Sequence, residues 1–152
     1  MFEPKRKWFS EIDWEDRTVL LKGILSIKEE DYGRFTELAL DAGMREALAG
    51  ESGEWAFSEE DGPRGVLEWL GFSMHEDEEG VDFIYFEDDG YGRYRDDMGR
   101  AVFDACAPVI GAGSVLVFME NWDEAEEKDP RIWRYTFDGE KMHVQGGRFV
   151  FD

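Results

Sequence analysis

The stretch Val81–Met119 constrains the fold more than any other, because it reads as strand, acidic turn, helix and strand. Residues 81–86 are β-branched and aromatic, which favours a strand, and the acidic turn 87–90 follows them. Apolar residues then recur at the spacing of one helix face. They are Tyr94, Met98, Ala101, Val102, Ala105 and Val109. Residues 115–119 form a second apolar run of strand length. We therefore predict that this helix packs on a sheet containing both strands and forms the core.

The residues before this unit add a strand and a helix. Residues 18–27 are predicted to form a strand, in which Gly23 indicates a bulge or the close approach of another element. Residues 29–31 are acidic and are expected to open a helix, since carboxylates suit the positive end of a helix dipole. Residues 65–74 suit either a short helix or a strand, and residues 75–80 are expected to be an acidic turn.

The C-terminal third has the clearest strand pattern. Residues 132–137 alternate, with Trp133, Tyr135 and Phe137 on one face, and Asp138-Gly139 is predicted to be a two-residue hairpin turn. Short apolar pieces at 55–57 and 149–151 are further strand candidates. We predict an α+β fold: an antiparallel or mixed sheet of about five to six strands, two main helices packed mostly on one face, and a C-terminal β-meander.

Length and composition favour one domain in a reducing compartment. The chain has 152 residues and 42% hydrophobic content, so we expect a single domain over residues 1–152, with residues 1–16 only loosely attached. The single cysteine, Cys106, excludes an internal disulfide, and we expect it to be buried. The basic cluster 5–7 has no apolar region after it, so no signal peptide is predicted. We expect a cytoplasmic protein without membrane contact.

The net charge is the most informative number for function. The chain carries 37 acidic and 17 basic side chains, a net charge of −20. Residues 51–97 hold 16 of these acids and only 3 of the bases. A small domain needs a net charge of magnitude about 2–8 for solubility, and a larger one costs self-repulsion in the folded state. Two hypotheses follow: the acidity binds a partner, or the chain is a generic acidic domain from a salt-adapted host.

No catalytic or metal motif stands out. His75 and His143 are the only histidines, and neither belongs to an H-x-x-x-H or C-x-x-C pattern. Residues 88–92 resemble a calcium loop only loosely, because the pattern D-x-[DN]-x-[DN]-G followed by Glu six places later is absent. We therefore expect no metal, no cofactor and no enzymatic activity. The alternative hypothesis is a small cytosolic enzyme with a site near His75 and Asp82.

The acidic middle region predicts a basic partner. Direct nucleic-acid binding is not expected, because that affinity comes mainly from Lys and Arg. A surface dense in carboxylates, with aromatic rings between them, can instead occupy a groove built for a nucleic-acid backbone. The candidate partner-binding residues are Glu59, Glu60, Asp61, Glu76, Asp77, Glu78, Glu79, Asp82, Glu87, Asp88, Asp89, Tyr91, Asp96 and Asp97.

Two resemblances point the same way. Residues 113–118 (GSVLVF) and 133–141 (WRYTFDGEK) look like parts of small bacterial and phage proteins. Being small, acidic and without motifs, the chain is also similar in type to nucleic-acid-mimicking inhibitors such as anti-restriction and anti-CRISPR proteins, and to toxin-neutralising immunity proteins. These resemblances carry over no catalytic residue. They imply a non-enzymatic inhibitor of a basic, nucleic-acid-binding protein or complex from a bacterial defence or toxin system.

Overall fold

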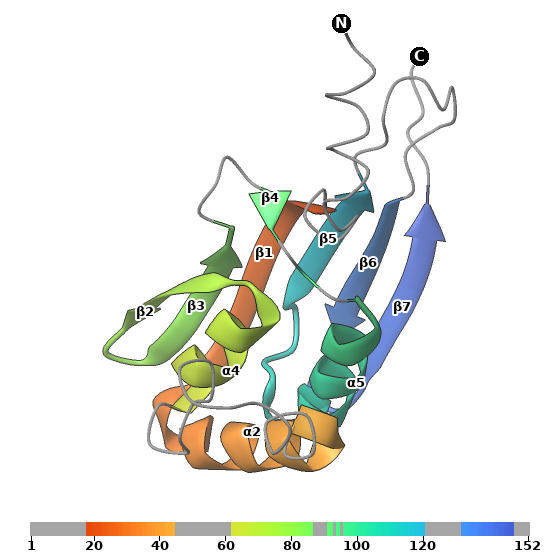
Figure 1. Ribbon diagram of the computed structural model, residues 1–152. Helices are drawn as coiled ribbons and strands as arrows, with labels where there is room; N and C mark the ends of the chain where they lie inside the picture. The colour runs from red at the N-terminus through yellow and green to blue at the C-terminus, as the bar shows by residue number, and fades with distance from the viewer. Residues whose placement is uncertain are drawn as a thin grey trace, which may run out of the picture.

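One antiparallel sheet organises the molecule, with helices gathered on one side of it (Figure 1). The computed structural model describes residues 18–44, 62–86, 91–92, 94, 96–120 and 132–147. The strands follow the order β2-β3-β1-β5-β6-β7, and β4 pairs with β1. Their bounds are β1 Thr18–Lys28, β2 Ser73–Asp77, β3 Gly80–Tyr85, β4 Tyr91–Gly92, β5 Val115–Glu120, β6 Ile132–Phe137 and β7 Met142–Gly147. The predicted α+β class and the C-terminal meander are confirmed.

Among the described residues, three α-helices cover the sheet, where two main ones were predicted. They are α2 (Tyr32–Ala39), α4 (Gly62–Leu70) and α5 (Asp96–Cys106), with short helical turns η2 (Glu29–Asp31), η3 (Leu40–Met44) and η5 (Ala107–Val109) beside them. Helix α5 contacts α2, and α2 contacts α4. Among the described residues, no helix has both the length and the apolar character needed to cross a membrane.

The central strand β1 joins the two halves of the sheet. It pairs with β3 on one side and β5 on the other, and its register shifts between Leu20 and Lys22 on the β5 side. A Cβ atom added to Gly23 would overlap the backbone carbonyl oxygen of Ile84 on β3. The alternative of a close approach at Gly23 is therefore confirmed, and the register shift toward β5 lies just before it, between Leu20 and Lys22.

The core forms between α5 and the sheet, as the strand–helix–strand pattern predicted. Val102, Phe103 and Cys106 of α5 are completely buried. The Phe103 ring meets the Phe137 ring of β6 edge-on, with centroids 6.4 Å apart and planes at 70°. The prediction that Ala101 lies on the buried face of the helix is wrong. Ala101 is exposed, and Phe103 and Cys106 face the core. The buried face is rotated toward these residues because the larger ring of Phe103 has more apolar surface to remove from water.

The ambiguous segment 65–74 contains both alternatives. Helix α4 runs to Leu70, Gly71 adopts a φ of 107°, and β2 begins at Ser73. The predicted acidic turn at 75–80 is wrong for four of its six residues, since residues 75–77 extend β2, Gly80 begins β3 and only residues 78–79 form the turn. Pairing with β3 keeps residues 75–77 extended, because it satisfies their backbone groups despite their polar side chains.

The β6–β7 hairpin has the predicted face but a longer turn. Trp133, Tyr135 and Phe137 are buried as expected. Phe137 pairs with Met142, so four residues connect the strands instead of two. The Asp138 side chain closes this turn by accepting the backbone N–H groups of residues 140 and 141 at 2.8 and 2.7 Å. The strands expected at 55–57 and 149–151, and the N-terminal segment 1–16, lie outside the described residues.

Candidate partner-binding site

The structure gathers five of the predicted partner-binding residues on one hairpin. Glu76, Asp77, Glu78, Glu79 and Asp82 all lie on β2, β3 or the turn between them, residues 73–85, which we call the acidic hairpin. In Figure 1 this hairpin forms the edge of the sheet at the β2 end.

The other predicted residues are not brought to the acidic hairpin within the described part of the chain. Asp97 is exposed at the start of α5, the helix that packs over β6. For Tyr91 and Asp96 only the backbone is described, in β4 and α5. Residues 59–61 and 87–89 lie outside the described residues. The regional charge excess is therefore not a single continuous face in the part of the chain that is described.

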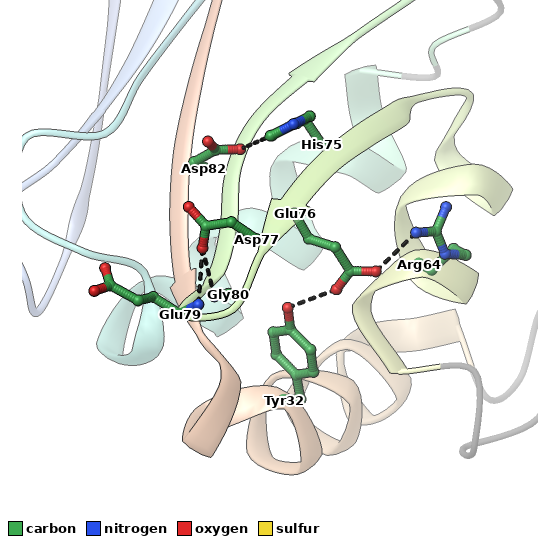
Figure 2. Close-up of polar contacts among 8 residues, drawn as sticks. All are labelled: Tyr32, Arg64, His75, Glu76, Asp77, Glu79, Gly80 and Asp82. Atoms are coloured by element: carbon green, nitrogen blue, oxygen red, sulfur yellow. Dashed lines mark hydrogen bonds and ion pairs between the residues drawn. The ribbon is translucent and has the colours of Figure 1, made fainter.

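Glu76 ties three elements together instead of pointing freely into solvent. Its two carboxylate oxygens accept hydrogen bonds from the Tyr32 hydroxyl of α2 and the Arg64 guanidinium of α4, both at 2.8 Å (Figure 2). The hydrogen bond from Tyr32, followed by that from Arg64, lowers the pKa of Glu76. Burial, together with the hydrogen bond to Glu76, raises the pKa of Tyr32 above its usual value. The carboxylate of Glu76 is thus already paired within the protein.

Asp77 shapes the turn of the acidic hairpin. Its Oδ1 atom accepts the backbone N–H groups of Glu79 at 2.8 Å and Gly80 at 3.2 Å (Figure 2). Gly80 adopts a φ of 142°, which L side chains rarely reach. The backbone N–H of Glu29 donates to the carbonyl of Glu79 at 2.9 Å, so the turn is also fastened to the end of β1. These bonds hold the turn in one conformation.

Glu78 and Glu79 are the carboxylates that the hairpin leaves for solvent. Both are exposed, and their side chains form no hydrogen bond or ion pair with another described residue. Glu29 and Glu30 of η2 are also exposed and line an open hollow of about 600 Å³ together with Glu79 and Lys28. Glu29 and Glu30 were not among the predicted partner-binding residues, because only the β1–β3 pairing, with Lys28 opposite Gly80, brings them to the hairpin.

His75 and Asp82, the pair named in the enzyme hypothesis, are adjacent. His75 Nδ1 lies 2.7 Å from Asp82 Oδ1, and since an ionised carboxylate only accepts, the ring nitrogen carries the proton. Both side chains are about half exposed. Among the described residues, no serine, threonine or cysteine is hydrogen-bonded to His75, and no three His, Cys, Asp or Glu side chains are grouped as a metal site. What the pair supplies is an oriented imidazole on a solvent-exposed face.

Cys106 offers little nucleophilic character. The residue is completely buried, and its Sγ donates to the backbone carbonyl of Phe35 at 3.4 Å. Burial raises the pKa of Cys106 to about 12, so the thiol stays protonated at neutral pH. The expectation of a buried cysteine is confirmed.

An exposed apolar patch lies beside the acidic hairpin. Phe83 and Tyr85 are each 41% exposed and Ile24 is 44% exposed. They lie on the sheet face away from the helices, since Phe83 and Tyr85 alternate along β3 with the buried Ile84 and Phe86. His75 stacks on Phe83, with ring centroids 4.8 Å apart and planes at 5°. We call His75, Phe83, Tyr85 and Ile24 the open-face patch.

The run 81–86 was predicted to be a strand of the sheet that packs on the helix, with no distinction between its two faces. In the structure β3 buries one face and leaves Phe83 and Tyr85 exposed on the other. Residues 83–86 are all apolar, so the sequence has no alternation that could have revealed the open face. Comparison of the chain with protein-family models, with curated proteins and with solved structures finds no match.

Proposed function

We propose that this protein is a non-enzymatic, cytoplasmic inhibitor that binds a basic, nucleic-acid-binding partner of a bacterial defence or toxin system. The observation that supports it best is the rigid turn of the acidic hairpin. Its unpaired carboxylates are those of Glu78 and Glu79, and Glu79 lines a hollow together with Glu29, Glu30 and Lys28. Carboxylates held in this way can take the place of backbone phosphates opposite Lys and Arg side chains.

The rigidity of the turn matters for affinity. Binding costs free energy for every flexible group that must be ordered, and a turn whose backbone is already fixed by Asp77 and Glu29 avoids the backbone part of that cost. Opposite charges also speed the encounter with a basic partner, and salt weakens this effect over a Debye length of about 10 Å at 0.1 M. The proposal therefore predicts binding that is fast at low salt and slower at high salt.

A charge-reversal comparison tests the proposal. The variant Glu78→Lys/Glu79→Lys alters the acidic hairpin, and Glu37→Lys/Asp104→Lys makes the same change in net charge on α2 and α5. All four residues are exposed, and none has a polar side-chain partner among the described residues. Each protein is titrated into purified basic nucleic-acid-binding proteins carrying a fluorescent DNA duplex, at 50 and 300 mM salt, after circular dichroism has verified folding.

The wild type is expected to displace duplex from at least one such protein, more strongly at low salt. The hairpin variant should lose most of this activity and the helix variant should keep most of it. Equal losses would mean that overall charge matters and position does not, as expected for a generic acidic domain from a salt-adapted host. Failure to displace duplex from any basic protein would contradict the proposal.

The adjacency of His75 and Asp82 favours a second candidate, a small enzyme that uses the imidazole as a general base. Under our proposal, no catalytic turnover depends on His75 or Asp82. Loss of a defined catalytic turnover in His75→Ala and Asp82→Asn, with duplex displacement unchanged, would favour the enzyme.

A further inference from the structure

The open-face patch is unusual for a chain with this much charge. Three large apolar side chains, Ile24, Phe83 and Tyr85, are each more than 40% exposed on adjacent strands. Ile24 and Phe83 are direct cross-strand partners, so the side chains form one surface. Exposed aromatic residues gathered in this way are typical of interaction sites.

The charge beside this patch is mostly negative. The acidic hairpin contains five carboxylates and no Lys or Arg, and Lys22, two residues from Ile24 on β1, is an exposed cation near the patch. A partner that covers the rings also meets the hairpin carboxylates that remain exposed there, of which Asp82 is paired with His75 of the patch, so charge complementarity favours a cationic partner. An apolar partner without positive charge would bury these carboxylates or leave them unpaired at the rim, which is unfavourable.

The His75–Phe83 contact shows which kind of cation the patch suits. A flat nitrogen ring lies parallel to Phe83 while its Nδ1 meets the Asp82 carboxylate at 2.7 Å. An arginine guanidinium has the same combination of properties: it is planar, stacks on aromatic rings and pairs with carboxylates through several N–H groups. A lysine ammonium pairs with carboxylates but cannot stack as a plane.

Resting on the function proposed above, we infer that the open-face patch is an arginine-binding site, where a guanidinium of the basic partner lies against Phe83 and Tyr85. Since His75 already stacks on Phe83, the Tyr85 ring offers the guanidinium a stacking surface. Its ring contact within the described residues is with Phe83, at a centroid distance of 6.0 Å, and 41% of the residue is exposed. The patch thus selects arginine over lysine, while the acidic hairpin attracts both.

Two peptides of equal charge test this assignment. Fluorescently labelled octa-arginine and octalysine are titrated with the full chain, and binding is followed by anisotropy at 100 mM salt. We expect octa-arginine to bind on the order of 2- to 30-fold more tightly than octalysine, the range of a cation–π contact. The variant Phe83→Leu/Tyr85→Leu should remove this preference while retaining the binding that both peptides share.

The matched control is Val144→Ala, which alters another exposed apolar residue, on β7 at the opposite edge of the sheet. It should leave the arginine preference unchanged, and Glu78→Gln/Glu79→Gln should weaken both peptides to a similar extent. Equal affinities of the two peptides, with acid-dependent binding retained, would overturn the arginine site and leave the proposed function standing. Absence of binding by either peptide would overturn both.

Two other possible occupants of the open-face patch, a second copy of the chain and the chain's own N-terminal segment, can be distinguished by experiment. A wild-type dimer in light scattering that becomes monomeric in Phe83→Leu/Tyr85→Leu would assign the patch to a second copy of the chain. Tighter peptide binding by the full-length variant Trp8→Ala/Trp14→Ala would assign it to the chain's own N-terminal segment. Either result would overturn the arginine site.

Discussion

Replacing Glu76 with glutamine should destabilise the fold without removing a partner-binding charge. The wild-type carboxylate accepts hydrogen bonds from Tyr32 and Arg64, which lie on two different helices. The Arg64 and Glu76 side chains are 49% and 36% exposed, so solvent screening limits their ion pair to about 0.2–1 kcal/mol. A weaker hydrogen bond from Tyr32 to a neutral amide adds a further loss of about 0.5 kcal/mol.

The free energy of unfolding should therefore fall by about 0.5–1.5 kcal/mol at pH 7, measured by urea denaturation. In a domain of this size, each kcal/mol corresponds to a decrease in melting temperature of about 2–4 °C. The matched control is Glu78→Gln, two residues along the chain, where the carboxylate has no polar partner among the described residues. That change should alter stability by less than about 0.5 kcal/mol.

The pH dependence gives a second test of the same contact. Hydrogen bonds from Tyr32 and Arg64 lower the pKa of Glu76, so its contribution is fully present above the ordinary value of 4.5. It is lost as the pH falls through the lower value of the folded state, where the carboxylate becomes protonated. The difference between wild type and Glu76→Gln should thus be smaller at pH 3 than at pH 7. Equal destabilisation by Glu76→Gln and Glu78→Gln at pH 7 would refute the assignment of Glu76 as a structural tie.

Two further changes test the packing. Val102→Asp places a charge at a completely buried position of α5 and should cost about 3–5 kcal/mol in denaturant unfolding; an unchanged melting temperature would remove α5 from the core. Gly23→Ala should cost about 1–3 kcal/mol, because its Cβ would overlap the carbonyl oxygen of Ile84 on the neighbouring strand. Gly146→Ala is its control, since no atom lies within 4 Å of the added Cβ, and a similar loss in both would contradict the steric explanation.

The sequence predicted the elements in which the spacing of apolar residues and the length of the segment indicate the same secondary structure. β6 alternates cleanly over six residues, and α5 is long enough to show a helical face, so both were predicted close to their observed bounds. The α4–β2 junction could not be resolved in this way, because residues 65–74 are apolar at spacings that suit either element. The positive φ of Gly71, which ends α4, depends on how the chain returns to the sheet, and local composition does not fix it.

The candidate site was predictable as a stretch but not residue by residue. The run from Glu76 to Glu79 stands out as acidic in the sequence, yet its members have different roles in the fold. The partners that use the charge of Glu76 are 44 and 12 residues away along the chain, at Tyr32 and Arg64. Only the tertiary structure therefore separates carboxylates that hold the fold together from those that remain for a partner.

The unpaired carboxylates near the acidic hairpin repel one another in the folded protein. The pairing of β1 with β3 brings Glu29 and Glu30 beside Glu79, and like charges at close range destabilise the folded state. The backbone bond between Glu29 and Glu79, with the cap from Asp77, holds them together despite the repulsion. Under the proposed function, the cations of a basic partner would relieve that repulsion on binding. Neutralising Glu78 and Glu79 should then weaken binding while leaving the free protein as stable as before or slightly more stable, the opposite of what Glu76→Gln does.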